Sequence, residues 1–130
     1  MSRAVTAARP GPNSLIDSHS RVAVVIPCYK VKRQIVDLIS NIGPEVDHIL
    51  LVDDACPEHS GEFAASKIDD ARLEVITHPE NQGVGGAVIS GMMSALEKRA
   101  DIIVKLDGDG QYDPALIPLL IGPIVEGAVD

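Results

Sequence analysis

Short apolar runs and longer amphipathic stretches alternate along the chain. The run Val22–Ile26 is rich in β-branched residues and stops at Pro27, which is typical of a strand buried on both faces. Similar runs at 49–52, 73–76 and 101–106 predict further strands. The segments between them are long enough for a crossover helix, so neighbouring strands can run parallel.

Apolar residues at helical spacing occupy the segments between these runs. The first helix ends at Gly43-Pro44, a second covers 58–68, a third follows the turn Gly83–Gly86, and a last one starts near Asp113-Pro114. The apolar positions that define the first three helices are Ile35, Leu38, Ile39 and Ile42; Phe63, Ala64 and Ile68; and Val88, Ile89, Met92, Met93 and Leu96.

Strands that alternate with helices predict an α/β fold, a doubly wound and mainly parallel sheet with helices on both faces. At 130 residues the chain is long enough for one domain, which we place at 21–130. Residues 1–20 carry Pro, Gly and Ser without periodicity and are expected to be a disordered lead-in. Aromatic residues make up only 2%, so Val, Ile, Leu and Ala must form the core.

Unusual residues follow the predicted strands at their carboxyl ends, where doubly wound sheets bind ligands. Pro27-Cys28-Tyr29 follows the first strand, Asp53-Asp54 the second, and Asp107-Gly108-Asp109 the fourth. The three loops are therefore expected to converge on one edge of the sheet.

Asp107 and Asp109 occupy alternate positions, so an extended backbone points both carboxylates the same way. Such oxygens suit Mg²⁺ or Mn²⁺, and Gly108 lets the backbone approach a diphosphate closely. Asp and Gly are also ordinary turn formers, and a simple strand-to-helix turn explains the motif equally well in isolation. Likewise, Asp53-Asp54 could cap the helix near 58 instead of contacting a nucleotide base.

The Gly83–Gly86 segment resembles a dinucleotide-binding loop, but it follows the third strand and not the first. A tight loop that allows close helix packing is the better interpretation. The histidines His19, His48, His59 and His78 match no ligand spacing and are interpreted as surface or structural residues.

The formal net charge of -8 argues against a nucleic-acid partner. Cys28 and Cys56 match no metal-ligand spacing and are expected to be buried, reduced thiols instead of a disulfide. The chain contains no apolar run of spanning length and no signal-peptide pattern, so we expect a cytoplasmic location.

Taken in order, four motifs resemble the family 2 glycosyltransferases of GT-A fold, and most closely the branch with dolichyl-phosphate mannose synthase and polyprenyl-phosphate sugar transferases. The resemblance covers residues 21–130. The motifs are Val25–Tyr29, Val52–Pro57, Asn81–Ala87 with Gly91, and Lys105–Pro114.

The resemblance implies a metal-dependent transferase that moves a sugar, with inversion, from a UDP- or GDP-linked donor to a polyprenyl-phosphate or saccharide acceptor. The chain departs from the family pattern at Lys30-Val31, where the family usually has Asn-Glu, and at Ala55-Cys56, where it usually has Gly-Ser. The implied nucleotide site comprises Pro27, Tyr29, Val31, Val52, Asp54, Asp107 and Gly108, and the implied metal ligands are Asp107, Asp109 and Gln111.

Family members continue well past the equivalent of Asp130, so we expect the catalytic residues beyond this chain. Any membrane contact would come from such a segment or a partner, at the inner face of the membrane. Two alternatives stay open: a binding-only module that holds nucleotide without transfer, and a nicotinamide-dependent oxidoreductase that uses the Gly83–Gly86 loop.

Overall fold

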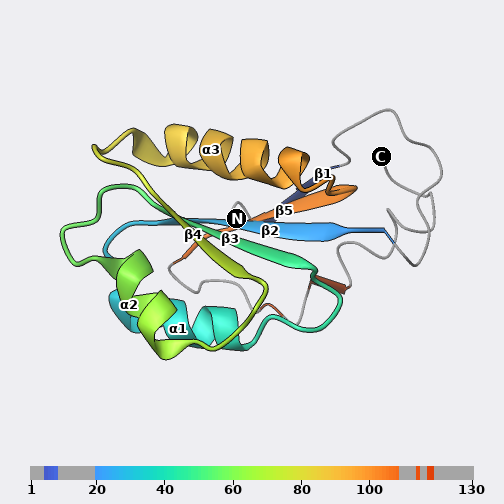
Figure 1. Ribbon diagram of the computed structural model, residues 1–130, viewed down its shortest axis with the longest axis horizontal. Coiled ribbons are helices and arrows are strands. Elements are labelled where there is room, and N and C mark those ends of the chain that lie inside the picture. Colours follow the sequence, from blue (N-terminus) through green and yellow to red (C-terminus); the bar gives the residue numbers. More distant parts are fainter. Residues whose placement is uncertain (1–4, 9–19, 109–113, 115–116, 119–130) are drawn as a thin grey trace.

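The computed structural model describes residues 5–8, 20–108, 114 and 117–118. Its strands form one sheet in the order β1-β5-β2-β3-β4, in which β1 alone is antiparallel to its neighbour. Helices α1 and α2 cover one face of this sheet and α3 covers the other (Figure 1). The elements are β1 Val5–Ala8, β2 Val22–Cys28, α1 Lys32–Ser40, β3 His48–Asp53, α2 Ser60–Lys67, β4 Leu73–Thr77, α3 Gly83–Glu97 and β5 Ile102–Leu106. The expected doubly wound, mainly parallel fold is confirmed.

The order of the strands creates a crevice at one edge of the sheet. From β2 the chain steps outward through β3 to β4, and α3 then returns it across the other face so that β5 pairs with β2. The strand order therefore reverses between β2 and β5, which makes the space at their carboxyl ends a topological switch point. The carboxyl ends of β2, β3 and β5 border the resulting space.

Strand β2 is the centre of the core, and all of its residues are buried. Alternate side chains enter two apolar clusters, Val24 and Ile26 with α1, and Ala23 and Val25 with α3. The strand runs two residues past the end that the sequence predicted. Pro27 is tolerated within it because pairing with β5 stops at Val25, so only β3 lies beside the proline.

Two features of the fold differ from what the sequence pattern indicates. Residues 5–8 of the lead-in form β1, because the free edge of β5 offers unpaired backbone groups that any compatible segment can satisfy. On α3, the sheet contacts the small residues Ala87, Gly91, Ser94 and Ala95, while the large apolar side chains Ile89, Met92, Met93 and Leu96 are exposed.

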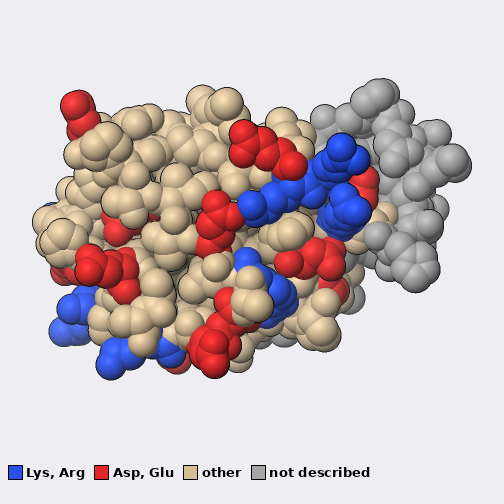
Figure 2. All heavy atoms as spheres, in the orientation of Figure 1, with Lys and Arg blue, Asp and Glu red and all other residues tan. Residues whose placement is uncertain are grey.

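The small residues let α3 lie close to the sheet. A Cβ atom on Gly91 would lie 2.3 Å from Cγ1 of Val25. Residues 83–96 include no charged side chain, and Figure 2 shows few charges over this helix. Among the described residues, no helix is both long and apolar enough to cross a membrane.

The predicted last helix, from Asp113-Pro114, lies mostly outside the described residues. Ile117 belongs to the described part, and its side chain is buried in the cluster on the α1 face. This contact closes the core beyond β5.

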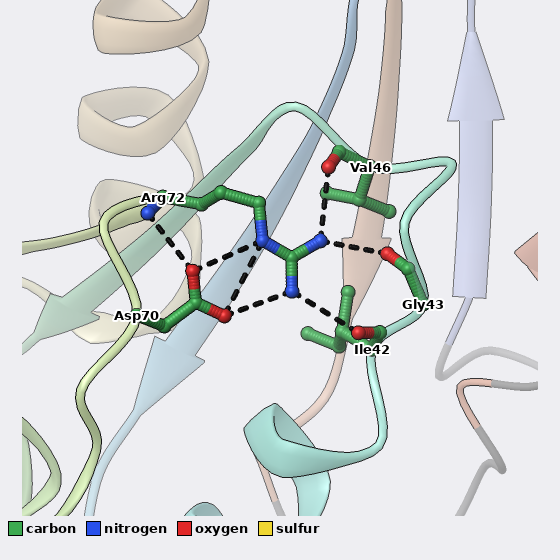
Figure 3. Close-up of polar contacts among 5 residues, drawn as sticks. All are labelled: Ile42, Gly43, Val46, Asp70 and Arg72. Atoms are coloured by element: carbon green, nitrogen blue, oxygen red, sulfur yellow. Dashed lines mark hydrogen bonds and ion pairs between the residues drawn. The ribbon is translucent and has the colours of Figure 1, made fainter.

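Arg72 ties the amino-terminal edge of the sheet together (Figure 3). Its guanidinium donates to the carbonyl oxygens of Ile42, Gly43 and Val46 at 3.1, 2.7 and 2.9 Å. It also forms an ion pair with Asp70 at 2.8 Å, whose hydrogen bonds lower the pKa of that carboxyl group. One side chain thus fixes the loop between α1 and β3 against the start of β4.

We expect the R72A variant to lose about 2–3 kcal/mol of unfolding free energy, since carbonyl groups at this half-buried site lose a charged donor. R72K is the matched control, because a lysine keeps the charge but cannot reproduce the planar set of hydrogen bonds that a guanidinium group makes. It should recover less than half of the lost unfolding free energy. Urea unfolding followed by circular dichroism measures both. Equal stability of R72A and the wild type would contradict this role.

Candidate functional site

A pocket of about 450 Å³ opens at the carboxyl-terminal edge of the sheet. This volume lies within the range of small-molecule sites, about 300–1,000 Å³. It is lined by Pro27, Cys28, Tyr29, Val31, Asp54, Asn81, Gly83, Val84, Ala87, Asp107 and Gly108. The three loops that the sequence predicted to converge therefore do so.

Most of the nucleotide-site residues implied by the sequence lie at this pocket. Val52 does not, because it is fully buried and its side chain faces Gly91 of α3. Asp109 and Gln111 lie outside the described residues, so their places as metal ligands stay predictions. The six that line the pocket are Pro27, Tyr29, Val31, Asp54, Asp107 and Gly108.

Gly108 occupies a position that leaves little room for a side chain. A Cβ atom there would lie 3.0 Å from the backbone oxygen of Pro27 and 3.2 Å from Cγ2 of Val31. The chain after β5 thus crosses directly over the end of β2. This crossing places the Asp107 carboxylate on the pocket wall, where its side chain is 30% exposed.

Asp54 organises the opposite wall. One carboxylate oxygen accepts the backbone N–H of Gln82 at 2.8 Å and the other that of Gly83 at 2.9 Å, at the start of α3. Nδ1 of His78 lies 2.9 Å from the same carboxylate, and Nε2 lies 2.7 Å from Oγ of Ser90. Asp54 is only 4% exposed, so its main contacts are within the protein.

These contacts show which of the two paired acids holds which helix. Asp53, and not Asp54, caps the helix after β3, since its carboxylate accepts the N–H groups of Cys56 and Gly61 at 2.8 and 2.9 Å. Asp54 holds the N-terminus of α3 at the pocket. The sequence missed the contribution of His78, because its partners lie 24 and 12 residues away.

The glycine-rich segment forms a tight turn into α3, in line with the interpretation that the sequence favoured. Gly91 allows close packing on the sheet, and Gly83, with φ of 81°, turns the chain into α3 at the pocket wall. The N-terminus of α3 thus borders the pocket, and its partial positive charge faces the Asp54 carboxylate.

Both cysteines are free and buried, as expected. Burial raises the pKa of the Cys28 thiol to about 12, and the nearby charge of Asp53 adds to the effect. Burial also raises the pKa of Cys56, but hydrogen bonds from Ser60 and the Lys30 N–H lower it by more. Within the described ranges, no group of three or more His, Cys, Asp and Glu side chains is arranged so that it could hold a metal ion.

The rim carries an aromatic ring. Tyr29 is 44% exposed, and Nζ of Lys30 lies 5.6 Å from the ring centroid. An exposed ring beside an apolar wall is suited to stacking against a planar base. At Asp107, which also lines the pocket, Nζ of Lys105 lies 2.9 Å from Oδ1.

Residues 23–130 match the sequence profile described as glycosyl transferase family 2. The chain belongs to glycosyl transferase family 2. It is 34% identical, over 78% of its length, to an undecaprenyl-phosphate mannosyltransferase of Micrococcus luteus, of which it covers 43%. It is 31% identical, over 83% of its length, to a dolichol-phosphate mannosyltransferase of Pyrococcus furiosus, of which it covers 31%. The chain therefore spans less than half the length of these curated relatives.

Solved structures show the same family fold. The glucosyl-3-phosphoglycerate synthase of Mycobacterium tuberculosis, crystallised with Mn²⁺, UDP-glucose and phosphoglyceric acid, matches with a TM-score of 0.68 and 23% identity. The match covers 92% of this chain and 46% of that one. The GT-A fold expected from the sequence is thereby confirmed.

Asp54 also gives the fold a defined pH response. Burial alone would raise its pKa, but the hydrogen bonds from Gln82, His78 and Gly83 lower it overall. Since the folded pKa lies below the unfolded value of about 3.9, ionised Asp54 stabilises the fold above about pH 4. This contribution is lost as the pH falls from there through the folded pKa.

We therefore expect the D54N variant to be less stable than the wild type by about 1–3 kcal/mol at pH 7, because its amide group faces backbone donors. The difference should shrink as the pH falls below about 4, where the wild-type carboxyl group itself becomes protonated. Urea unfolding of both proteins between about pH 2.5 and pH 7 would test this, because that range brackets the titration of the Asp54 carboxyl group. A difference that is the same at every pH would contradict the assignment.

Proposed function

We propose that this chain is the donor-binding part of a metal-dependent glycosyltransferase. Its pocket holds a nucleoside diphosphate sugar, linked to UDP or GDP, for transfer to a polyprenyl-phosphate or saccharide acceptor, with inversion at the anomeric carbon. The observation that carries the proposal is the convergence of the six implied nucleotide-site residues on one pocket at the switch point of the sheet. The names of the relatives and of the solved neighbour support the substrate classes.

The pocket offers a place for the base and for the diphosphate of such a donor. The exposed ring of Tyr29 can stack on the base, and the glycine crossing at Gly108 leaves room for a diphosphate to approach the backbone. The N-terminus of α3, which Asp54 holds in place, borders the same space. Because the chain has a net charge of -8, binding of an anionic donor requires a local cation such as a divalent metal.

The described residues fit a divalent metal at Asp107. Its carboxylate lines the pocket, is partly exposed and already pairs with a cation, the ammonium group of Lys105. Hard oxygen ligands of this kind suit Mg²⁺ or Mn²⁺, and Asp109 and Gln111 would complete the set. When bound, the metal would neutralise the charge that develops on the departing nucleoside diphosphate.

Calorimetry with UDP- and GDP-sugars, with and without Mn²⁺, tests the proposal. We expect one of the two nucleotides to bind in the presence of Mn²⁺ and to bind at least about tenfold more weakly after EDTA is added, since a metal that bridges protein and phosphates is removed. A folded sample without metal-dependent binding would contradict it. Binding without transfer or hydrolysis, with transfer restored by a downstream segment, would make the chain a binding-only module.

A further inference from the structure

We propose that Lys105 is a counter-ion that exchanges between Asp107 and the donor diphosphate, and that it makes metal binding depend on the nucleotide. This inference rests on the function proposed above. It starts from an ion pair that no sequence pattern indicated. Nζ of Lys105 lies 2.9 Å from Oδ1 of Asp107, and the two side chains are 25% and 30% exposed.

The backbone places this ammonium group at the edge of the pocket. Lys105 lies in β5 two residues before Asp107, so the alternation of the strand directs both side chains toward the same face, the one that α3 covers. Asp107 lines the pocket and Lys105 does not. The lysine therefore reaches the site through the carboxylate it contacts.

Asp107 is the pocket carboxylate that is available for exchange. Asp54 also lines the pocket, but both of its oxygens accept backbone N–H groups from the start of α3. No lysine or arginine is among the pocket-lining residues that the structure describes. Lys105 thus supplies positive charge next to the one acid, among the described pocket residues, that a metal could take.

A divalent cation and the Lys105 ammonium compete for the same carboxylate. A metal on Asp107 must displace the ammonium group or lie a few ångströms from it, and like charges at that distance repel. Lys105 should therefore weaken the binding of metal alone. The side chain is long and flexible, so the displaced ammonium group remains close to the pocket.

A diphosphate resolves this competition. Its oxygens accept hydrogen bonds from the ammonium group while the metal takes Asp107, so both cations then have anionic partners. Metal and nucleotide should consequently bind together better than either binds alone. By linkage, each increases the affinity of the chain for the other by the same factor.

The K105M variant separates this role from a structural one. We expect it to bind Mn²⁺ alone about three- to tenfold more tightly, since the repulsion is gone. In saturating Mn²⁺ it should bind UDP about five- to tenfold more weakly, since the diphosphate loses a charged donor. Electron paramagnetic resonance of free Mn²⁺ measures the first affinity and calorimetry the second. Loss of the folded state would instead weaken the binding of both Mn²⁺ and UDP.

Two controls are available. K105R keeps the charge and should leave both affinities within about twofold of the wild type. K98M removes an equivalent ion pair, Lys98 with Glu74 at 2.6 Å, which does not involve the pocket, and should change neither affinity. Unchanged affinities in K105M, or two shifts in the same direction, would overturn the proposal.

The outcomes also distinguish this inference from the proposed function. If the wild type binds UDP with Mn²⁺ and K105M behaves identically, only the role of Lys105 fails. If the folded wild type binds neither Mn²⁺ nor UDP, both fail.

Discussion

The D107N variant is expected to lose metal-dependent binding of the nucleotide. Asparagine keeps the size of the side chain but removes the negative charge that would hold a hard cation. It also removes the ion pair with Lys105. Loss of an outer-shell partner alone typically costs about 10- to 100-fold in metal affinity, so loss of a direct ligand should cost at least that. Calorimetry with UDP or GDP in Mn²⁺ measures the effect.

The matched control lies at the other end of the same strand. Asp101 precedes β5, and its carboxylate accepts the N–H of Arg21 far from the pocket. D101N makes the same chemical change, and its nucleotide affinity should equal that of the wild type. Metal-dependent binding that survives in D107N would remove Asp107 from the site.

The G91A variant should be markedly less stable than the wild type. The added methyl group would lie 2.3 Å from Cγ1 of Val25 and 3.2 Å from Cγ2 of Val52, and both valines are fully buried. Either α3 moves away from the sheet or the strand yields, and overpacking of this kind costs about 1–3 kcal/mol. Because α3 also forms a wall of the pocket, nucleotide affinity should fall as well. Urea unfolding followed by circular dichroism measures the loss of stability.

Gly85 provides the control within the same helix. A Cβ atom there meets nothing within 4 Å, so G85A gains helix propensity without a clash. It should be more stable than the wild type by about 0.5–1 kcal/mol. The same substitution six positions apart is thus expected to have opposite signs. Stability changes of the same sign would contradict the packing of α3 described above.

Much of the fold could be predicted because its central strands are buried on both faces. Such strands are continuous apolar runs, and β2, β3 and β5 stand out in the sequence for that reason. The pocket followed from one further rule, that parallel strands present their carboxyl ends at a common edge. Asp107 and Asp54 could therefore be placed together without knowledge of any contact.

The orientation of α3 could not be predicted from its pattern. Helical spacing of large apolar residues ordinarily marks the buried face, and here Ile89 and Met93 obey that spacing but are exposed. The sheet surface beneath the helix is filled by Val25 and Val52, so only a small residue such as Gly91 fits against it. A single sequence does not show how far the strand side chains project.

The remaining differences come from contacts between distant residues. His78 contacts Asp54 across 24 residues, and β1 exists because β5 has a free edge. In the sequence, Lys105 is only one polar position in an apolar strand, and its contact with Asp107 is visible in the structure alone. Motifs located the acids of this site, and only the structure showed which partners hold them.

The most direct test of the metal-dependent donor site is paramagnetic broadening of amide signals in a ¹⁵N-labelled chain. In the presence of UDP, substoichiometric Mn²⁺ should broaden the signals of Tyr29, Val31 and Gly108, which border the pocket. The signals of Val46 and Arg72, at the opposite edge of the sheet, should keep their intensity. Broadening that is strongest away from the pocket, or equal everywhere, would contradict the account.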